Sequence, residues 1–344
     1  MGINLSDLAV KKEVDYDFLK GKSFVVDSFN VLYQFLSSIR QMDGTPLMDS
    51  KGRVTSHLVG LFSRTTKLMK LGLKLAFVFD GKSPELKAKE HEKRAKIKEE
   101  AEKQYRIAEE RKDIELMKKY AQRTSKLTTE MIEESKELIK ALGLPVIQAP
   151  SEGEAQAAMM VKKGEFFAAV SQDYDCLLFG VPRMVQNLTI SEKKKMPSKL
   201  VYEKITPVMI ELQETLKNLE INQDQLIALG LLVGTDFNIG GIKGIGPKNA
   251  LKLVKQYKDD FDKMFNEVRW GDYFDCDWHE VFDLFKNMPT TDDYKLEWSQ
   301  IEREKIMKIL VEEHDFSRER VQKQLDELNL INKQRAQKGL SDFV

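Results

Sequence analysis

Two closely spaced pairs of acidic residues stand between residues 150 and 180, in a stretch that otherwise predicts a helix followed by a buried strand. The first pair is Glu152 and Glu154, and the second is Asp173 and Asp175. Carboxylates crowded beside an apolar strand repel one another, so some of them must stay protonated or take up cations. Oxygen ligands suit Mg²⁺ or Mn²⁺, whereas Zn²⁺ prefers nitrogen and sulfur ligands. We therefore predict a divalent-metal site, and two ions roughly 3.5–4 Å apart would be able to support phosphodiester cleavage.

Further aspartates stand at the ends of other predicted strands. The apolar runs 22–26 and 75–79 end at Asp27 and Asp80, and the run 166–170 leads to the second acidic pair. A fourth strand, 144–148, leads to the loop before Glu152. These strands alternate with helical patterns, which predicts an α/β fold with a mostly parallel sheet. Ligands of such sheets bind beyond the carboxyl ends of the strands, so we expect the acids to converge on one edge.

Each acid also has an ordinary structural explanation. Ser151 and Glu154 fit a capping box, in which the glutamate bonds back to the start of its helix. Asp175 would cap the helix that follows it, and Asp80 with Gly81 fits a turn. For any single acid, this structural explanation is stronger than a role in metal binding. For the whole set of acids, the structural explanation is weaker.

The composition changes between residues 82 and 126, where Lys, Arg and Glu dominate and aliphatic residues are sparse. One interpretation is a solvated pair of helices supported by charge pairs four residues apart, such as Glu92 with Lys96. The other is a mobile basic insertion that contacts an anion. Composition alone favours the first.

A glycine-rich segment, Gly240–Asn249, precedes another predicted helix. Its glycines allow backbone N–H groups to approach a phosphate, and a helix N-terminus favours an anion. Pro247 suits the first helical turn, and Lys243 and Lys248 add positive charge. The alternative is a simple glycine-rich connector. The repeated Gly-Ile-Gly-Pro-Lys pattern favours a phosphate site, which would hold a DNA backbone without reading its sequence.

The rest of the chain sets broader limits. We expect a strand at 184–190, a basic loop at 193–195, helices over 206–233, and helices with loops as far as about 332. The 344 residues are enough for a large core, and Lys plus Arg equal Asp plus Glu at 55 each, so the net charge is uninformative. The two cysteines suggest free thiols in a reducing compartment. We find no secretory signal and no apolar run of membrane-spanning length, and expect a cytoplasmic protein.

Six separated motifs occur together in this chain: VVDSFNVLYQFL, RQMDGTPLMDSKGRVTSHLVGLFSRT, FVFDGKSPELK, QAPSEGEAQAA, SQDYDCLLFG and LVGTDFNIGGIKGIGPKNA. In this order they resemble the flap endonucleases of the structure-specific 5′ nuclease superfamily, above all its archaeal members, over nearly the whole length. The resemblance implies a PIN-like nuclease core with a central twisted sheet flanked by helices. It implies the following parts: nuclease core at 1–81 and 129–265, a helical arch insertion at 82–128, a helix–hairpin–helix-like element at 234–257, a C-terminal helical region at 266–332, and a flexible tail at 333–344.

The resemblance also implies a function. Such an enzyme cuts branched DNA near the base of a 5′ flap during replication and repair, with 5′–3′ exonuclease activity in addition, and leaves 5′-phosphate and 3′-hydroxyl ends. Two Mg²⁺ ions would serve it, with Mn²⁺ as a substitute, and a K⁺ ion would bind hairpin carbonyls near Ile242 and Ile245. The expected partners are flapped DNA and a sliding clamp. We expect a monomer associated with the nucleoid.

The site residues implied by the resemblance fall into four groups. For the first ion they are Asp27, Asp80, Glu152 and Glu154, and for the second Asp173, Asp175 and Asp236, with Asp175 counted as catalytic. Lys87 and Arg94 match catalytic cations, and Tyr33 matches an aromatic that stacks on a base. The DNA contacts are Arg40, Thr55, Ser56, Arg64, Glu152, Gly234 and Asp236, with Ile242, Lys243, Gly244, Ile245, Gly246 and Lys248 of the hairpin. The clamp-binding residues are Gln337, Leu340, Phe343 and Val344, the last standing where family members usually have an aromatic.

Two other functions compete with this one. A DNA-binding or clamp-tethered scaffold would need no catalysis, but it would have no reason to gather so many carboxylates near DNA. A sibling 5′ exonuclease, or an enzyme that cuts bubbles or junctions, would share the acids. The short insertion and the clamp-like tail favour the flap enzyme.

Overall fold

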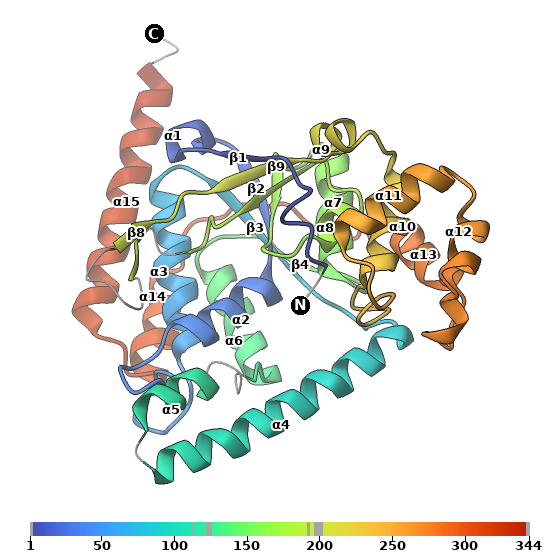
Figure 1. Ribbon diagram of the computed structural model, residues 1–344. Coiled ribbons are helices and arrows are strands. Elements are labelled where there is room, and N and C mark those ends of the chain that lie inside the picture. Colours follow the sequence, from blue (N-terminus) through green and yellow to red (C-terminus); the bar gives the residue numbers. More distant parts are fainter. Residues whose placement is uncertain (1–2, 112, 122–125, 191–192, 196–201, 342–344) are drawn as a thin grey trace.

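A computed structural model describes residues 3–111, 113–121, 126–190, 193–195 and 202–341 of the chain (Figure 1). Its centre is a seven-stranded sheet in the order β1-β9-β6-β5-β2-β3-β4. The strands of this sheet are β1 (Lys11–Glu13), β2 (Ser23–Asp27), β3 (Lys74–Phe79), β4 (Val146–Gln148), β5 (Ala168–Val170), β6 (Arg183–Gln186) and β9 (Val208–Glu211). The five strands from β6 to β4 are parallel, and β9 and β1 are antiparallel to their neighbours. The predicted α/β fold with a mostly parallel sheet is confirmed.

Helices cover both faces of the sheet. They are α1 (Tyr16–Leu19), α2 (Ser28–Ser38), α3 (Ser56–Lys70), α6 (Thr129–Ala141), α7 (Gly153–Lys162), α8 (Asp175–Leu178), α9 (Leu212–Leu219), α10 (Gln223–Val233), α11 (Pro247–Tyr257), α12 (Phe261–Glu267), α13 (Trp278–Asn287), α14 (Arg303–Met307) and α15 (Arg318–Ser341), with the short helices η2 (Trp270–Asp272) and η3 (Lys308–Glu313), the latter a π-helix.

Alternation along the strands divides the core into two layers. In β2, Val25 packs with the side chains of α7 to α10, whereas Phe24 and Val26 pack with those of α2, α3 and α6. In β3, Ala76 packs in the layer of Val25, and Leu75 packs in the layer of Phe24 and Val26. Successive side chains of a strand point to opposite faces, and both faces of a parallel sheet are covered, so the central strands β2, β3 and β5 consist almost entirely of buried apolar residues.

The basic insertion is helical and lies mostly outside this core. It contains η1 (Glu85–Lys87), α4 (Ala88–Glu110) and α5 (Ile114–Ala121). Figure 1 shows α4 as one long helix that crosses beneath the sheet, from α5 toward the group formed by α10 to α13. Ala101 and Ala108 are buried, but Ile97 and Ile107 are exposed, in keeping with a charged and poorly packed helix.

The structure corrects several local predictions. Residues 208–211, expected to be helical, form strand β9, and the basic stretch 193–195, expected to be a loop, forms a strand that pairs with Tyr202–Lys204. The strand expected over 184–190 ends at Gln186. Residues 333–341, expected to belong to a flexible tail, continue α15, because Lys, Gln, Arg, Ala and Leu favour helices. Residues 342–344 lie outside the described part.

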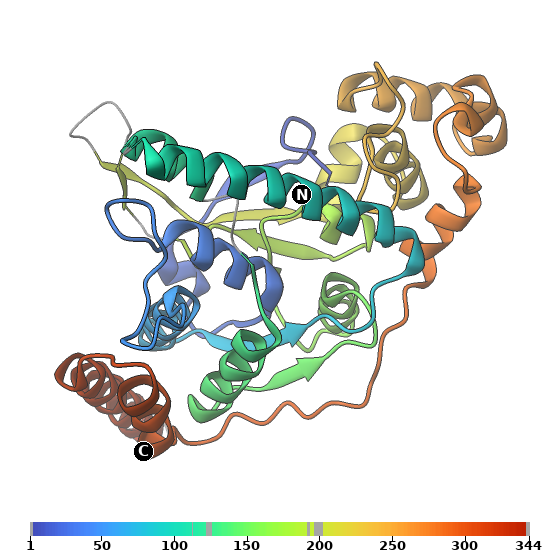
Figure 2. The ribbon, with the colours of Figure 1, turned by 90° about the horizontal axis from the view of Figure 1, so that it is seen from below.

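Residues 288–302, expected to lie within helices and loops, contain no helix or strand. Figure 2 shows this segment running from the α12–α13 group to the C-terminal helices along the outside of the core. The Trp298 indole donates to the carbonyl of Leu75 at 2.8 Å, and the amide of Gln156 exchanges two hydrogen bonds of 2.9 Å with the backbone of Thr291. The segment is therefore fixed by long-range contacts. Among the described residues, no helix has the length and apolar composition needed to span a membrane.

Candidate active site

The predicted acids lie along the carboxyl edge of neighbouring strands. Asp27 ends β2, and Asp80 follows β3, which pairs with β2 in parallel. Glu152 stands at the N-cap position of α7 beyond β4, without a capping bond from its side chain, and Asp173 follows β5 on the other side of β2. Because these strands are adjacent and parallel, residues far apart in the sequence meet at one place.

Uncharged groups hold several of the acids in position. The backbone N–H of Asn30 donates to Asp27 at 3.1 Å, and the side-chain amide of Asn30 donates to Asp173 at 3.0 Å. The Ser171 hydroxyl lies 3.2 Å from Asp27 Oδ2 and 3.4 Å from Glu154 Oε1. Sequence patterns did not single out Asn30 or Ser171, although Ser171 directly follows β5. A polar residue at the end of a buried strand was the signal available.

Backbone donors hold two more carboxylates. The N–H of Gly153 donates to Asp80 Oδ1 at 2.7 Å, and that of Ile3 donates to Asp175 Oδ1 at 3.0 Å. Gly153 begins α7, so its N–H is one of those that a helix leaves free for an outside acceptor. The start of the chain and the start of α7 thus both contribute to the acidic site.

Burial and mutual repulsion keep these acids partly protonated. Burial raises the pKa of Asp27 to about 8, with the charge of Asp80 as the next cause. Burial likewise raises the pKa of Asp80 to about 6, with Glu152 adding to the effect. The pKa of Asp175 is raised to about 7 by burial, against the bond from Ile3, and the pKa of Glu154 is raised well above its usual value. Such carboxylates gain much by binding a cation.

Direct ligation of one ion by three side chains does not describe this arrangement. Within the described residues, no three His, Cys, Asp or Glu side chains form a group that could hold an ion. Mg²⁺ keeps several of its waters and is usually held through one or two carboxylates. The donor set therefore fits Mg²⁺ bound partly through water. Burial, and next the charge of Glu154, raise the pKa of the nearby Cys176 thiol well above its usual value, so it stays protonated and does not offer the thiolate that Zn²⁺ prefers.

Two cations from the basic insertion contact the acids. Lys87 Nζ lies 2.6 Å from Glu152 Oε2 and 3.7 Å from Asp236 Oδ2, and Arg94 Nη2 lies 2.9 Å from Asp236 Oδ2. Burial lowers the pKa of Lys87, but its carboxylate neighbours, Glu152 first, raise it more, so the net shift is upward. Since η1 and the start of α4 enter the site, this part of the insertion is more than a solvated helical pair.

Known proteins that are similar to this chain identify its family. The XPG N-terminal domain matches residues 1–101, and the XPG I-region matches residues 143–236. Flap endonuclease 1 of Pyrococcus abyssi is 52% identical over 317 residues, which cover 92% of this chain and 91% of that protein. The chain belongs to the flap endonuclease family. Its function is that of a metal-dependent, structure-specific nuclease.

Solved structures extend the comparison. The flap endonuclease-1 from Methanococcus jannaschii has a TM-score of 0.76 and 41% identity, covering 97% of this chain and all of that one. A Holliday junction-resolving enzyme, solved with product DNA and a Mg²⁺ ion, has a TM-score of 0.54 and 15% identity, covering 88% of this chain and 70% of that one. The second likeness shows the fold alone.

A pocket of about 410 Å³ adjoins the acidic site of this flap endonuclease family member. It lies between α2 and the arch, and is lined by Tyr33, Arg94, Ala95, Lys98, Glu99, Glu102 and Lys126. Lys98 Nζ is 5.1 Å from the centre of the Tyr33 ring. Tyr33 thus shares this pocket with Arg94, one of the two cations that contact the acids.

The glycine hairpin follows α10 and precedes α11. Gly234 has φ +105°, a backbone conformation that favours glycine. A Cβ there would lie 2.4 Å from the backbone nitrogen of Gly241, so the close approach of the two segments also requires glycine at this position. Ile242 is buried and its N–H donates to Leu232 at 2.9 Å, whereas Lys243, Gly244, Gly246 and Lys248 are exposed. The carbonyl of Ile242 accepts a bond from Ile245 at 3.0 Å.

The remaining predicted DNA contacts lie on the other side of α2. Arg40 donates to the carbonyl of Gly44 at 2.9 Å, and Arg64 is half-buried on α3. Thr55 and Ser56 are buried, and the Ser56 hydroxyl donates to Ile39 at 2.7 Å and accepts from the N–H of Leu47 at 2.9 Å. Ser56 is therefore engaged within the fold, and its contact with DNA stays a prediction.

The tail residues are only partly described. Gln337 and Leu340 lie in α15, and Phe343 and Val344 lie outside the described residues. The clamp-binding role of this tail stays a prediction.

Proposed function

We propose that the enzyme removes 5′ flaps, and single 5′-terminal nucleotides, by Mg²⁺-dependent hydrolysis that leaves 5′-phosphate and 3′-hydroxyl ends. The observation that carries the proposal is the cluster of buried acids with raised pKa values, directly beside Lys87 and Arg94. Carboxylates that cannot all ionise are ready to bind divalent ions, and the adjacent cations are placed for a phosphate.

We assign two ions to the site. The first would be held by Asp27, Asp80, Glu152 and Glu154, and the second by Asp173, Asp175 and Asp236, with some of these carboxylates reaching their ion through bound water. Two Mg²⁺ ions, or Mn²⁺ in their place, would activate water and stabilise the leaving oxygen when bound. The hydrogen bonds from Asn30, Gly153 and Ile3 orient the carboxylates, which reduces the reorganisation needed when the ions bind.

Residues of the arch would act on the phosphodiester itself. Lys87 and Arg94 would neutralise charge that develops on the phosphate, in a site where burial strengthens such interactions. Tyr33 borders the pocket beside Arg94 and would stack on a base next to the cut, a contact that every base allows. The single strand would then pass along the pocket under α4.

The hairpin would hold the duplex at a distance from the cut. Exposed Lys243 and Lys248 flank glycines, and Gly246 precedes the N-terminus of α11, so backbone N–H groups and the helix end both favour a phosphate. A K⁺ ion at the carbonyls of Ile242 and Ile245 would strengthen this contact. Arg40, Thr55, Ser56, Arg64 and Gly234 complete the proposed DNA interface, with Glu152 and Asp236 near the scissile strand.

We also propose a partner, an oligomeric state, a location and a role for each part of the chain. The tail with Gln337, Leu340, Phe343 and Val344 would bind a sliding clamp, and the enzyme would work as a monomer in the cytoplasm at the nucleoid. The parts 1–81, 82–128, 129–265 and 266–332 would serve as core, arch, core with hairpin, and C-terminal support.

Cleavage of a labelled 5′-flap DNA in Mg²⁺ tests the proposal. Asp175→Ala should abolish cutting and leave DNA binding, measured in Ca²⁺, largely intact. Asp224→Ala is the matched control, because the side chain of Asp224 is 41% exposed and pairs with Lys286 at 2.5 Å on the surface. Full cutting by Asp175→Ala would overturn the assignment. A parallel set of nicked, bubble and four-way junction substrates separates a flap enzyme from a sibling nuclease.

A further inference from the structure

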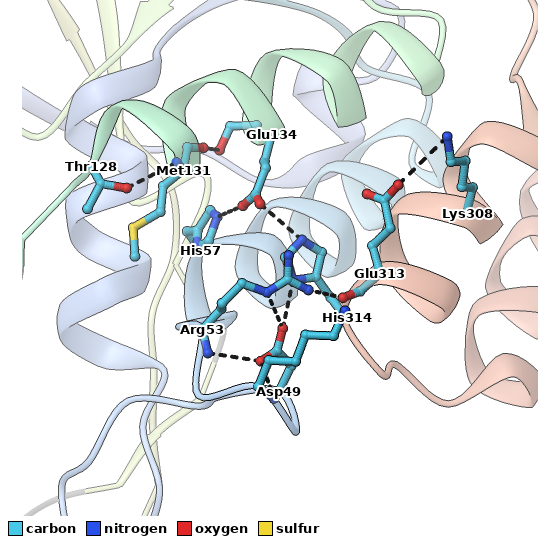
Figure 3. Close-up of polar contacts among 11 residues, drawn as sticks. Asp49, Arg53, His57, Thr128, Met131, Glu134, Lys308, Glu313 and His314 are labelled. Carbon is cyan, nitrogen blue, oxygen red and sulfur yellow. Dashed lines mark hydrogen bonds and ion pairs between the residues drawn. The ribbon is translucent and has the colours of Figure 1, made fainter.

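A second cluster of charged side chains lies away from the acidic site, between α3, α6 and the segment that follows η3 (Figure 3). Its two imidazole rings, His57 and His314, are buried, with exposed fractions of 0% and 3%. The carboxylate of Glu134 lies between them, with Oε2 at 3.4 Å from His57 Nε2 and Oε1 at 3.2 Å from His314 Nε2. The nuclease site does not use these groups.

The other ring nitrogen of His314 reaches the loop before α3. Its Nδ1 lies 3.3 Å from Asp49 Oδ2, and Asp49 in turn accepts from Arg53 Nε at 2.8 Å. Arg53 Nη2 donates to the carbonyl of Glu313, and Asp315 accepts from the N–H of Ser50 at 2.8 Å. Figure 3 shows Asp49, Arg53 and His314 side by side at the junction of the two segments. The contacts form a latch between loop 42–54 and residues 313–315.

Electrostatics indicates a latch and not a metal site. The hydrogen bond of the latch joins His314 Nδ1 and Asp49, whereas His57 Nε2 and His314 Nε2 lie near Glu134 without hydrogen-bond geometry. Burial lowers the pKa of His57, so this ring is neutral at physiological pH. Burial acts to raise the pKa of Glu134, but His57 and His314 lower it more, so Glu134 stays charged. Within the described part of the chain, these side chains do not form a group that could hold an ion.

The latch borders a pocket of about 400 Å³. The pocket is lined by Leu47, Met48, Asp49, Ser50, Thr55, Val59, His314, Asp315 and Phe316. Its walls are thus the two segments that the latch joins, and its floor is the start of α3. Loop 42–54 contains no strand or helix, only two isolated bridges, so its position depends strongly on such contacts.

We propose that His314, through its contact with Asp49, and Arg53, through its contact with Glu313, are positioning residues for DNA binding. They hold loop 42–54 against the C-terminal segment and keep the shape of the pocket in which the DNA would contact Thr55. This inference rests on the proposed function, in which Thr55 contacts DNA. None of these residues reaches the acidic site. The latch therefore sets the affinity for the substrate and leaves the chemical step alone.

Two amide variants of His314 separate its two contacts. The amide nitrogen of asparagine stands where Nδ1 of histidine does, so His314→Asn keeps a donor for Asp49 and loses the contact with Glu134. The amide nitrogen of glutamine stands near Nε2, so His314→Gln keeps the contact with Glu134 and loses Asp49. KM and kcat for flap cleavage are measured for both. Loss of a hydrogen bond to a charged group predicts a KM raised roughly tenfold for His314→Gln, with kcat within about twofold, and a KM within about threefold of the original for His314→Asn.

Arg53→Gln and Lys308→Gln complete the test. Arg53 is 42% exposed in its side chain, so this variant should fold, and it should raise KM as His314→Gln does. Lys308, on the same C-terminal segment, is 68% exposed in its side chain and pairs with Glu313 at 3.8 Å, so its replacement should leave KM unchanged. Thermal melting confirms that each variant is folded. An unchanged KM in both His314→Gln and Arg53→Gln, or equal losses in His314→Gln and His314→Asn, would overturn the latch. Absence of flap cleavage by the unaltered enzyme would instead refute the proposed function.

Discussion

Replacing Gly81 by alanine should push apart two segments that carry the acids. The N–H of Gly81 donates to the carbonyl of Ser151 at 2.7 Å, and the N–H of Lys82 donates to Pro150 at 3.1 Å. The hydroxyl of Ser151 returns a bond to Lys82 at 3.0 Å. These bonds tie the residues after Asp80 to those just before Glu152.

The size of the effect follows from the space available. A Cβ at position 81 would lie 2.2 Å from the carbonyl oxygen of Ala149 and 2.5 Å from that of Pro150. Ordinary contact begins at 3.4 Å, so the strands' ends must separate by about 1 Å, and backbone atoms cannot rotate away. A misplacement of about 1 Å costs roughly 100-fold in catalysis. Overpacking of this kind costs about 1–3 kcal/mol of stability, which leaves the protein folded.

Single-turnover cleavage of flap DNA over a range of Mg²⁺ concentrations measures the loss. We expect a rate about 100-fold lower for Gly81→Ala and a higher Mg²⁺ requirement, with DNA binding in Ca²⁺ little changed. Gly271→Ala is the control, because a Cβ there meets nothing within 4 Å. A Gly81→Ala enzyme that cuts within threefold of the original rate would refute the reasoning that these hydrogen-bonded segments fix the acids.

Three further predictions concern the acids, the arch and the tail. The pKa values of Asp27 and Asp175 are raised to about 8 and 7, so the metal-free folded state binds more protons than the unfolded chain between about pH 4 and 8. The free energy of unfolding should therefore fall as the pH rises through that range. Added Mg²⁺ should accordingly raise Tm more at pH 8 than at pH 5. A Tm that rises with pH in EDTA would contradict this. Lys87→Ala should slow cleavage roughly 100-fold with little loss of DNA affinity, whereas Lys103→Ala, which removes an exposed pair with a neighbouring glutamate, should not; equal losses would count against the role of Lys87. Deletion of 337–344 should spare intrinsic cleavage and remove stimulation by a sliding clamp, and unchanged stimulation would count against the proposed tail.

The strands that carry the acids were predictable because they are short, apolar and followed by polar residues. Strand β9 was not, because Val208–Glu211 runs directly into α9, where Leu212, Leu216 and Leu219 repeat with helical spacing. A short apolar run beside a helical pattern has no period of its own. The course of 288–302 was equally hidden, since contacts with Leu75 and Gln156 determine it and local sequence does not.

Sequence patterns predicted those acidic residues of the site that follow a strand. The ends of predicted strands indicated the positions of Asp27 and Asp80. Asp236 instead lies in a turn after α10, where Thr235 and Asn238 are hydrogen-bonded to each other, and it does not follow a strand. Its place was implied only by family resemblance. The uncharged groups that orient the carboxylates, such as Ser171, carry no charge pattern and become visible only when distant segments are brought together.

Charge balance connects the arch to the ions. The seven proposed ligands would carry seven negative charges, and Lys87 and Arg94 offset two of them; two Mg²⁺ ions would offset four more, leaving a single negative charge. In the structure Lys87 and Arg94 pair with Glu152 and Asp236, which are themselves proposed ligands. Ions bound by these carboxylates would therefore weaken the hold on both cations, and a phosphate brought by DNA would supply a new partner at the same place. The arch would thus move from carboxylate to phosphate without leaving the site, so metal and DNA should each raise the affinity for the other.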